Sequence, residues 1–129
     1  MIPCPCGTNK TYSECCDKFI SGQMRPTTPE ELMRSRYTAY TQANIDYIIQ
    51  TMQGAALKGF DAESAQLWAK QVHWKRLKVI KSRFGKSRGY VEFRAYYSLN
   101  NQAHIMHEIS EFYFDHERWY YIGQKKRTL

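Results

Sequence analysis

The chain has 129 residues, a length that fits one compact domain with a small appendage. Its composition of 43% hydrophobic and 24% charged residues supplies enough apolar surface for a buried core and gives no sign of disorder. No apolar run approaches the roughly 18 residues that span a bilayer, and the first residues, MIPCPCG, have neither the basic nor the apolar region of a signal peptide. We therefore expect a folded protein of the cytoplasm with no second large domain and no membrane contact.

The chain starts with a stretch, CPCGTNKTYSECC, that holds all four of its cysteines, Cys4, Cys6, Cys15 and Cys16. Cytosolic thiols stay reduced, so a cysteine cluster there more often binds a metal than forms disulfides, and a disulfide between neighbours would be strained. Zn²⁺ prefers four such ligands in a tetrahedron, and so short a segment needs a metal to supply its folding energy. We place the cap of a short helix at Ser13, just before the second cysteine pair. The spacing predicts one structural zinc ion with no open position for catalysis.

The stretch SGQMRPTTP, which is rich in turn-forming residues, separates two units. We assign residues 1–22 to the metal-binding segment, 23–28 to a linker and 29–127 to the main domain. Thr28, followed by proline and two glutamates, has the pattern of a capping box and predicts a helix start. Asn44 and Asp61 can cap two further helices. The three predicted helices cover residues 29–43, 45–52 and 62–71.

From Trp74 onward the sequence alternates with a period of two and is rich in β-branched and aromatic residues, which is typical of strands. We predict four strands, at residues 74–84, 89–99, 103–114 and 118–124. The loops between them are short, which favours antiparallel hairpins. Helices followed by an antiparallel meander predict an α+β fold in which the helices cover one face of a curved sheet.

The stretch CPCGTNKTYSECC resembles the SEC-C motif, in which two early cysteines and a final pair bind one Zn²⁺. Together with LMRSRYTAY (32–40), HEISEF (107–112) and WYYIG (119–123), it makes the chain similar to the YchJ-like family of small bacterial SEC-C proteins. This resemblance implies a nuclear-transport-factor-2-like domain, a cone of three helices wrapped by a bent antiparallel sheet. It also implies that all four cysteines are zinc ligands.

Folds of this kind often enclose a pocket, and the candidates for its lining are the polar residues on otherwise apolar elements: Arg34, Arg36, His107, Glu108 and Ser110. His107 and Glu108 are neighbours in a strand, so they face opposite sides of the sheet. The family resemblance favours Glu108 and Ser110 as the inward pair. A buried Glu108 needs a partner, and Arg34 or Arg36 can supply one in a structural salt bridge. The alternative role for Glu108 is that of a general base.

A basic segment follows the helices, with seven basic and no acidic residues: Lys75, Arg76, Lys78, Lys81, Arg83, Lys86 and Arg88. This density favours contacts with phosphates and a salt-dependent binding to RNA. Strict alternation, however, puts Lys75 and Lys81 on one side of the strand and Arg76 and Lys78 on the other. The alternative interpretation is therefore a solvated strand with no single basic face.

These features favour a zinc-binding adaptor that holds a protein partner or an RNA partner, for example on the ribosome. The alternative is an enzyme or a small-ligand-binding protein that uses the cone cavity, although no nucleophile, phosphate-loop or cofactor motif is present. The fold alone cannot decide between them, and we favour the role without catalysis. Cones of this kind often associate through their sheets, so a homodimer is a further hypothesis.

Overall fold

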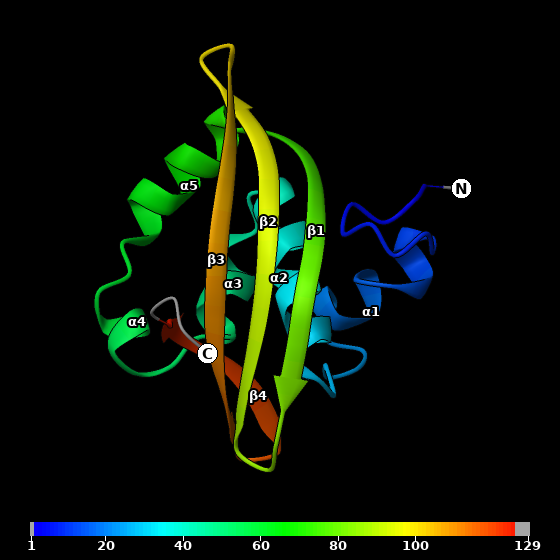
Figure 1. Ribbon diagram of the computed structural model, residues 1–129, viewed down its shortest axis with the longest axis vertical. Helices are drawn as coiled ribbons and strands as arrows, with labels where there is room; N and C mark the ends of the chain where they lie inside the picture. Colours follow the sequence, from blue (N-terminus) through cyan, green and yellow to red (C-terminus); the bar gives the residue numbers. More distant parts are fainter. Residues whose placement is uncertain (1, 126–129) are drawn as a thin grey trace.

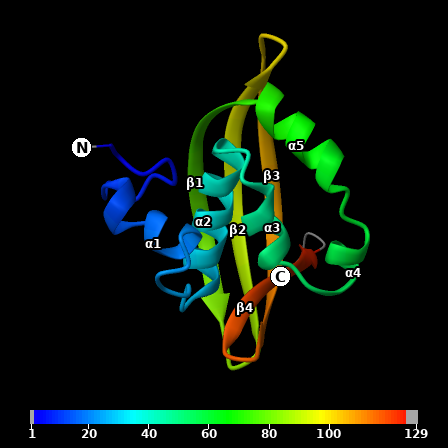
Figure 2. The same cartoon turned by 180° about the vertical axis from the view of Figure 1, so that it is seen from behind.

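The computed structural model describes residues 2–125, and the predicted end of the main domain at residue 127 lies outside them. Helices lie on one side of an antiparallel sheet, as Figure 1 and, from behind, Figure 2 show. The helical elements are η1 (Tyr12–Glu14), α1 (Asp17–Ile20), α2 (Pro29–Thr41), α3 (Ile45–Gln50), α4 (Gly54–Lys58) and α5 (Ala62–Gln71). The strands are β1 (His73–Phe84), β2 (Arg88–Leu99), β3 (Gln102–Asp115) and β4 (Arg118–Gln124). The predicted α+β class is confirmed.

The three main helices start where the sequence predicts. The side chains of Thr28, Asn44 and Asp61 each accept a backbone N–H of the first helical turn, at 3.1, 3.2 and 3.1 Å. Each bond satisfies an N–H group that has no partner inside its own helix. None of the helices described between residues 2 and 125 is long and apolar enough to cross a membrane.

Two helical elements differ from the prediction. Ser13 lies inside η1 and does not cap a helix, whereas Cys16 stands at the cap position of α1. The short helix α4 was missed by the sequence analysis, and it starts after Gln53 without a side-chain cap. A helix without a capping residue lacks the local signal on which such a prediction depends.

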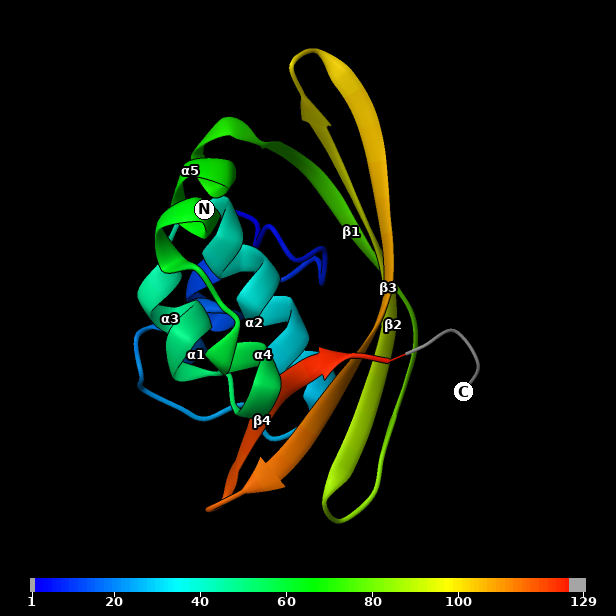
Figure 3. The same cartoon turned by 90° about the vertical axis from the view of Figure 1, so that its left-hand side faces the viewer.

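The strands pair in the order β1-β2-β3-β4, and every pair is antiparallel, which confirms the predicted meander. Two register shifts interrupt the β1–β2 pairing, between Trp74 and Arg76 and between Val79 and Lys81. Each shift changes which side chains of β1 face the helices. In Figure 3 the sheet curves around the helical layer, with β4 turned toward α4.

The loop after α3 covers the outer edge of β4. The Tyr121 N–H donates to the Thr51 carbonyl at 2.8 Å, and the Gln53 N–H donates to the Tyr121 carbonyl at 3.0 Å. Met52 and Tyr121 form a parallel bridge between these two bonds. An edge strand that is paired in this way offers fewer free backbone groups to another chain.

The main core lies between α2 and the sheet. It combines the four cysteines with side chains from α2 and from all four strands: Leu32, Met33, Tyr37, Leu77, Val91, Phe93, Ala95, Phe112 and Trp119. A second buried cluster surrounds α3 and contains Phe19, Ala39, Tyr47, Ile48 and Met52. The cysteine segment therefore packs into the core of the main domain.

Residues 23–28, which we expected to be a linker, are held by hydrogen bonds at several points. The Met24 N–H donates to the Lys18 carbonyl at 2.8 Å. The Glu31 carboxylate accepts the N–H and the hydroxyl of Thr27 at 2.8 and 2.9 Å, and the Trp119 indole N–H donates to the Thr27 carbonyl at 3.3 Å. These bonds fix the path of the chain between the cysteine segment and α2.

Candidate functional site

The four cysteine sulfurs form a compact group that can hold a metal ion. Their Sγ atoms all lie within 4.8 Å of one another, and the four side chains are buried, free thiols. A tetrahedral ion with Zn–S bonds of about 2.3 Å places its sulfurs about 3.8 Å apart, and Cys6 Sγ lies 3.6 Å from Cys15 Sγ. The donor set therefore fits one four-coordinate ion closed by protein ligands.

The local backbone explains how the two cysteine pairs converge. Pro3 and Thr11 pair as an antiparallel bridge that closes a small hairpin, and Gly7 supplies the positive φ of +85° that the turn needs. Cys15 lies between η1 and α1 with φ −124° and ψ −107°, so the chain bends there. Neighbouring residues in a regular helix point about 100° apart. The bend therefore brings the sulfurs of Cys15 and Cys16 into the same group.

Hydrogen bonds among the cysteine thiols shift their pKa values in opposite directions. The bond from Cys16 is the largest of the causes that lower the pKa of Cys6 to about 4, and the same bond raises the pKa of Cys16 well above its ordinary value. Burial raises the pKa of Cys15, although the Thr8 hydroxyl lies 3.1 Å from its sulfur. The hydrogen bond therefore favours the thiolate at Cys6 and the thiol at Cys16, and a metal ion bound by four thiolates would displace the remaining protons.

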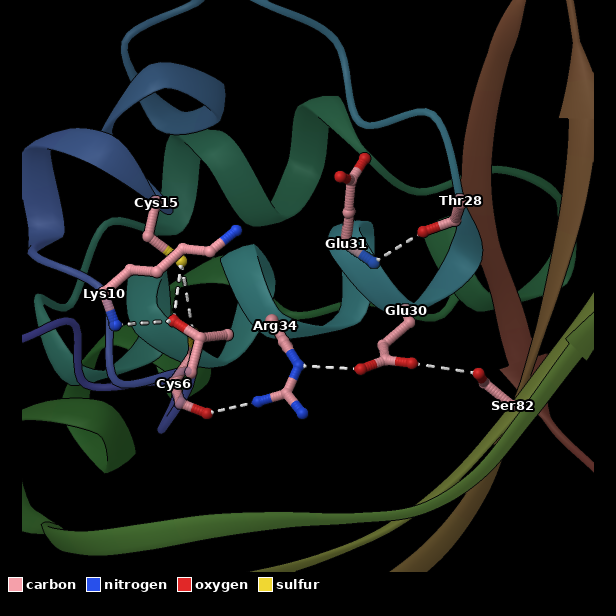
Figure 4. A network of polar contacts seen from close by, with 9 residues as sticks. Cys6, Lys10, Cys15, Thr28, Glu30, Glu31, Arg34 and Ser82 are labelled. Carbon is pink, nitrogen blue, oxygen red and sulfur yellow. Dashed lines mark hydrogen bonds and ion pairs between the residues drawn. The ribbon is translucent and has the colours of Figure 1, made fainter.

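Arg34 connects the cysteine segment to α2 and to the sheet. Its Nη1 donates to the Cys6 carbonyl at 2.6 Å, its Nε donates to Glu30 at 3.0 Å, and the other Glu30 oxygen accepts the Ser82 hydroxyl at 3.0 Å. Figure 4 shows this chain of contacts from Cys6 to β1. Arg34, which we had expected in a pocket, is thus held at the cysteine segment. It lies two residues from Arg36, so the two side chains point about 200° apart on the helix.

A cavity of about 390 Å³ lies between the helices and the concave face of the sheet. Its lining is mostly aromatic and aliphatic, and its polar groups include Arg36 from α2, Glu108 and Ser110 from β3, and Tyr121 from β4. The structure therefore brings Arg36, Glu108 and Ser110 together and leaves the other two of the five candidates, Arg34 and His107, outside the cavity. Sequence reasoning missed Tyr121. Its cross-strand partner is Phe112, which lies two residues from Ser110, so all three side chains share one face of the sheet.

Tyr121 contacts both charged groups of the cavity. The Arg36 guanidinium lies 4.6 Å from the centre of its ring, and its hydroxyl donates to Glu108 Oε2 at 3.2 Å. The Ser110 hydroxyl donates to the same oxygen at 2.5 Å. Burial and the nearby Glu108 raise the pKa of Tyr121, so its hydroxyl keeps its proton. Within residues 2–125, no ion pair shorter than 4.0 Å joins Arg36 to Glu108, so the salt bridge that we considered is not formed.

Arg36 is anchored by the helical layer. Its Nη1 donates to the Ile48 carbonyl at 2.9 Å and to the Thr51 hydroxyl at 2.7 Å, and the residue is only 8% exposed. Burial lowers the pKa of Arg36, and the neighbouring tyrosines oppose this shift. An arginine keeps its proton under ordinary conditions. The cavity wall on the helix side therefore carries a buried positive charge.

The two bulges of β1 gather its basic residues on the outer face of the sheet. The cross-strand partners of Arg76, Lys78, Lys81 and Arg83 on β2 are Tyr96, Arg94, Glu92 and Tyr90. Alternate residues of β2 share one face, and directly opposite residues share a face as well. The four basic side chains therefore lie together, on the side of the sheet away from the helices. Strict alternation could not predict this arrangement because a bulge depends on the partner strand.

The remaining basic candidates take other positions. Lys75 lies at the first bulge, Lys86 in the β1–β2 turn, and Arg88 opposite Tyr113 on the outer face. All seven predicted basic residues are exposed. Arg94, which sequence reasoning missed because it lies on β2, joins them on that face. His107 also faces outward, with its Nε2 2.7 Å from a Glu92 oxygen.

Comparisons with known proteins agree with this architecture. Residues 28–124 match the family model of the YchJ middle NTF2-like domain, and residues 2–17 match the SEC-C motif. A UPF0225 protein of Geobacter sulfurreducens is 39% identical over 121 residues, which are 92% of this chain and 75% of the relative. The chain therefore belongs to the YchJ-like family, and its predicted NTF2-like fold is confirmed.

Two solved structures share the fold over nearly the whole chain. The solution structure of a SEC-C motif protein from Rhodopseudomonas palustris has a TM-score of 0.91 at 33% identity and covers 98% of this chain and 100% of its own. The crystal structure of a SEC-C motif protein from Psychrobacter arcticus has a TM-score of 0.83 at 26% identity, with coverages of 100% and 86%. A cysteine segment together with an NTF2-like domain is thus common to these proteins.

Proposed function

We propose that this protein is a zinc-stabilised binding module of the cytoplasm that holds an RNA partner on the outer face of its sheet. The observation that carries the proposal is the basic outer face, which consists of Arg76, Lys78, Lys81, Arg83, Arg88 and Arg94. A dense group of cations on one face favours phosphate contacts.

A structural role for the zinc ion is supported by burial of the ligands. Cys4, Cys6, Cys15 and Cys16 are at most 8% exposed and share one core cluster with the main domain. Catalytic zinc sites keep a position open for water, whereas structural sites are closed by four protein ligands. The ion would therefore stabilise the module and leave recognition to other surfaces.

Aromatic rings between the cations support a single-stranded partner. Arg76 lies 4.2 Å from the Tyr96 ring centre, and Arg83 lies 5.7 Å from that of Tyr90. Proteins that bind single strands combine a cationic groove with aromatic rings on which bases stack. The outer face also carries Glu111, whose carboxylate is paired with Arg88 at 2.7 Å.

The test is fluorescence anisotropy with a labelled oligouridine. If about four phosphates are neutralised, affinity falls roughly 50-fold between about 50 and 200 mM salt. The double variant Lys78→Glu/Arg83→Glu should weaken binding by about tenfold or more at low salt. The matched control is Lys58→Glu/Lys70→Glu, which makes the same charge change at exposed positions on the helices.

The proposal fails if oligouridine does not bind at low salt, or if the two double variants weaken binding equally. Light scattering on the same samples adds a second criterion. A salt-independent homodimer that buries the outer face and leaves no RNA binding would also overturn it, and would favour the protein-partner hypothesis instead.

A further inference from the structure

The cavity presents two opposite charges that do not pair with each other. Arg36 projects from α2 and Glu108 from β3, and Tyr121 contacts both. Only Nη1 of Arg36 and only Oε2 of Glu108 have hydrogen-bond partners among residues 2–125. The other guanidinium nitrogens and Glu108 Oε1 are therefore available to a bound molecule.

Another part of the lining is a cluster of aromatic rings. Trp68 and Trp74 are nearly perpendicular, at 85°, with centroids 5.3 Å apart. Tyr40 meets the Trp68 ring at 84° and 6.3 Å. Ligand pockets combine such apolar walls with a few polar groups that fix orientation. Flat rings bind well against walls of this kind because they stack or meet edge to face.

The charges decide which flat ligand fits. An anion would pair with Arg36 but would be repelled by the Glu108 carboxylate. A cation would pair with Glu108 but would be repelled by Arg36. A neutral molecule with an acceptor beside a donor satisfies both groups at once. In a ring amide, the carbonyl oxygen accepts from Arg36 while the neighbouring N–H donates to Glu108.

We propose that the cavity binds a small, uncharged, planar heterocycle in which a ring carbonyl adjoins a ring N–H. Arg36 and Glu108 hold the amide edge, and Trp68 and Trp74 contact the ring. This site lies on the opposite side of the sheet from the proposed RNA surface, so each proposal can be tested independently of the other.

Hypoxanthine and purine are the matched probes, because purine has the same ring system without the carbonyl and its neighbouring N–H. Binding is followed by tryptophan fluorescence and by the NMR shifts of the indole N–H groups. We expect hypoxanthine to bind roughly tenfold more tightly than purine or better, since the lost contacts leave buried polar groups unpaired. Benzoate and benzylamine serve as the anionic and cationic probes.

The side-chain test is Glu108→Gln, which keeps the shape of the residue and removes its charge. It should weaken hypoxanthine binding by about tenfold, whereas Glu111→Gln, on the same strand but the outer face, should leave it unchanged. If Glu108→Gln does not fold, the wild-type NMR shifts decide. Shifts at Trp68 and Trp74 but not at Trp119, which does not line the cavity, support the proposal.

The proposal is overturned if benzoate or benzylamine binds more tightly than hypoxanthine, or if purine binds equally well. It is also overturned if both glutamate variants behave alike, if Trp119 shifts in place of the cavity tryptophans, or if hypoxanthine does not bind at all.

Discussion

At the scale of single residues, Arg34 fastens the cysteine segment to the main domain through the Cys6 carbonyl and Glu30. We predict that Arg34→Ala lowers the free energy of unfolding by about 1–3 kcal/mol, because a charge-assisted hydrogen bond to a partly buried carbonyl is lost. Release of the metal to a chromogenic chelator should also become faster. Arg25→Ala, at an exposed arginine, is the control. Equal release rates in the two variants would contradict the prediction.

Tyr47 gives a prediction for alkaline pH. Burial raises its pKa from 10.0 to about 12, and its hydroxyl lies 2.7 Å from the Ser35 hydroxyl. The folded state favours the neutral phenol, so this contribution to stability is complete below pH 10 and is lost as the pH rises through about 12. Urea unfolding should therefore show a stability that falls across this range.

Tyr47→Phe should reduce that fall without abolishing it, because burial also raises the pKa of Tyr37 to about 12. Tyr113→Phe, on the outer face, is the matched control. If the two phenylalanine variants lose stability with the same dependence on pH, buried Tyr47 does not cause the effect.

The cysteines and Arg34 also show what local sequence can reveal at this scale. The grouping of the four thiols could be predicted because all four cysteines lie within one short stretch. The role of Arg34 could not, because its partner is a backbone carbonyl 28 residues away. The opposite sides of Arg34 and Arg36 on α2 follow from helix geometry, but which side faces the cavity depends on packing.

At the scale of elements, Gly89 sets the distance between β2 and the start of α2. A Cβ added there would lie 2.4 Å from Pro29 Cγ and 3.0 Å from Phe84 Cβ. We predict that Gly89→Ala destabilises the protein by about 1–3 kcal/mol, since helix and strand must move apart. Gly85→Ala, in the turn before β2, is the control because a Cβ there meets nothing within 4 Å. In thermal unfolding, Gly89→Ala should melt at a lower temperature than Gly85→Ala. Similar melting temperatures would refute the prediction.

Helix starts and strands differed in how well their details could be predicted. The caps at Thr28, Asn44 and Asp61 act within one turn, so they are visible in sequence. The bulges of β1 arise from pairing with β2, and they bring Lys81 to the same face as Arg76 and Lys78, which strict alternation had placed on the other side. Ser13 has the residue type of a cap, but the bend at Cys15 placed the start of α1 three residues later.

At the scale of the whole molecule, the cysteines belong to the same core as α2 and the sheet. We predict that native mass spectrometry finds one zinc ion per chain, and that a strong chelator lowers the melting temperature of the entire domain by roughly 10 °C or more. The reason is that removal of the ion leaves four buried thiols without their shared partner.

Added zinc should restore the melting temperature, and Cys16→Ser should resemble the chelated wild type. A freshly purified protein that carries no metal, or that melts at the same temperature after chelation, would show that the thiols are held together without an ion.

The pairing of β4 with the loop after α3 bears on the order of events during synthesis. The four cysteines are made before Tyr121, which bonds to Thr51 and Gln53. Trp119 of the same strand belongs to the same buried core cluster as the cysteines. We therefore expect the cysteines of the nascent chain to capture a metal before β4 is made, and the shared core to be completed afterwards. A metal ion that the cysteines hold would then already be in place when β4 pairs with the loop after α3.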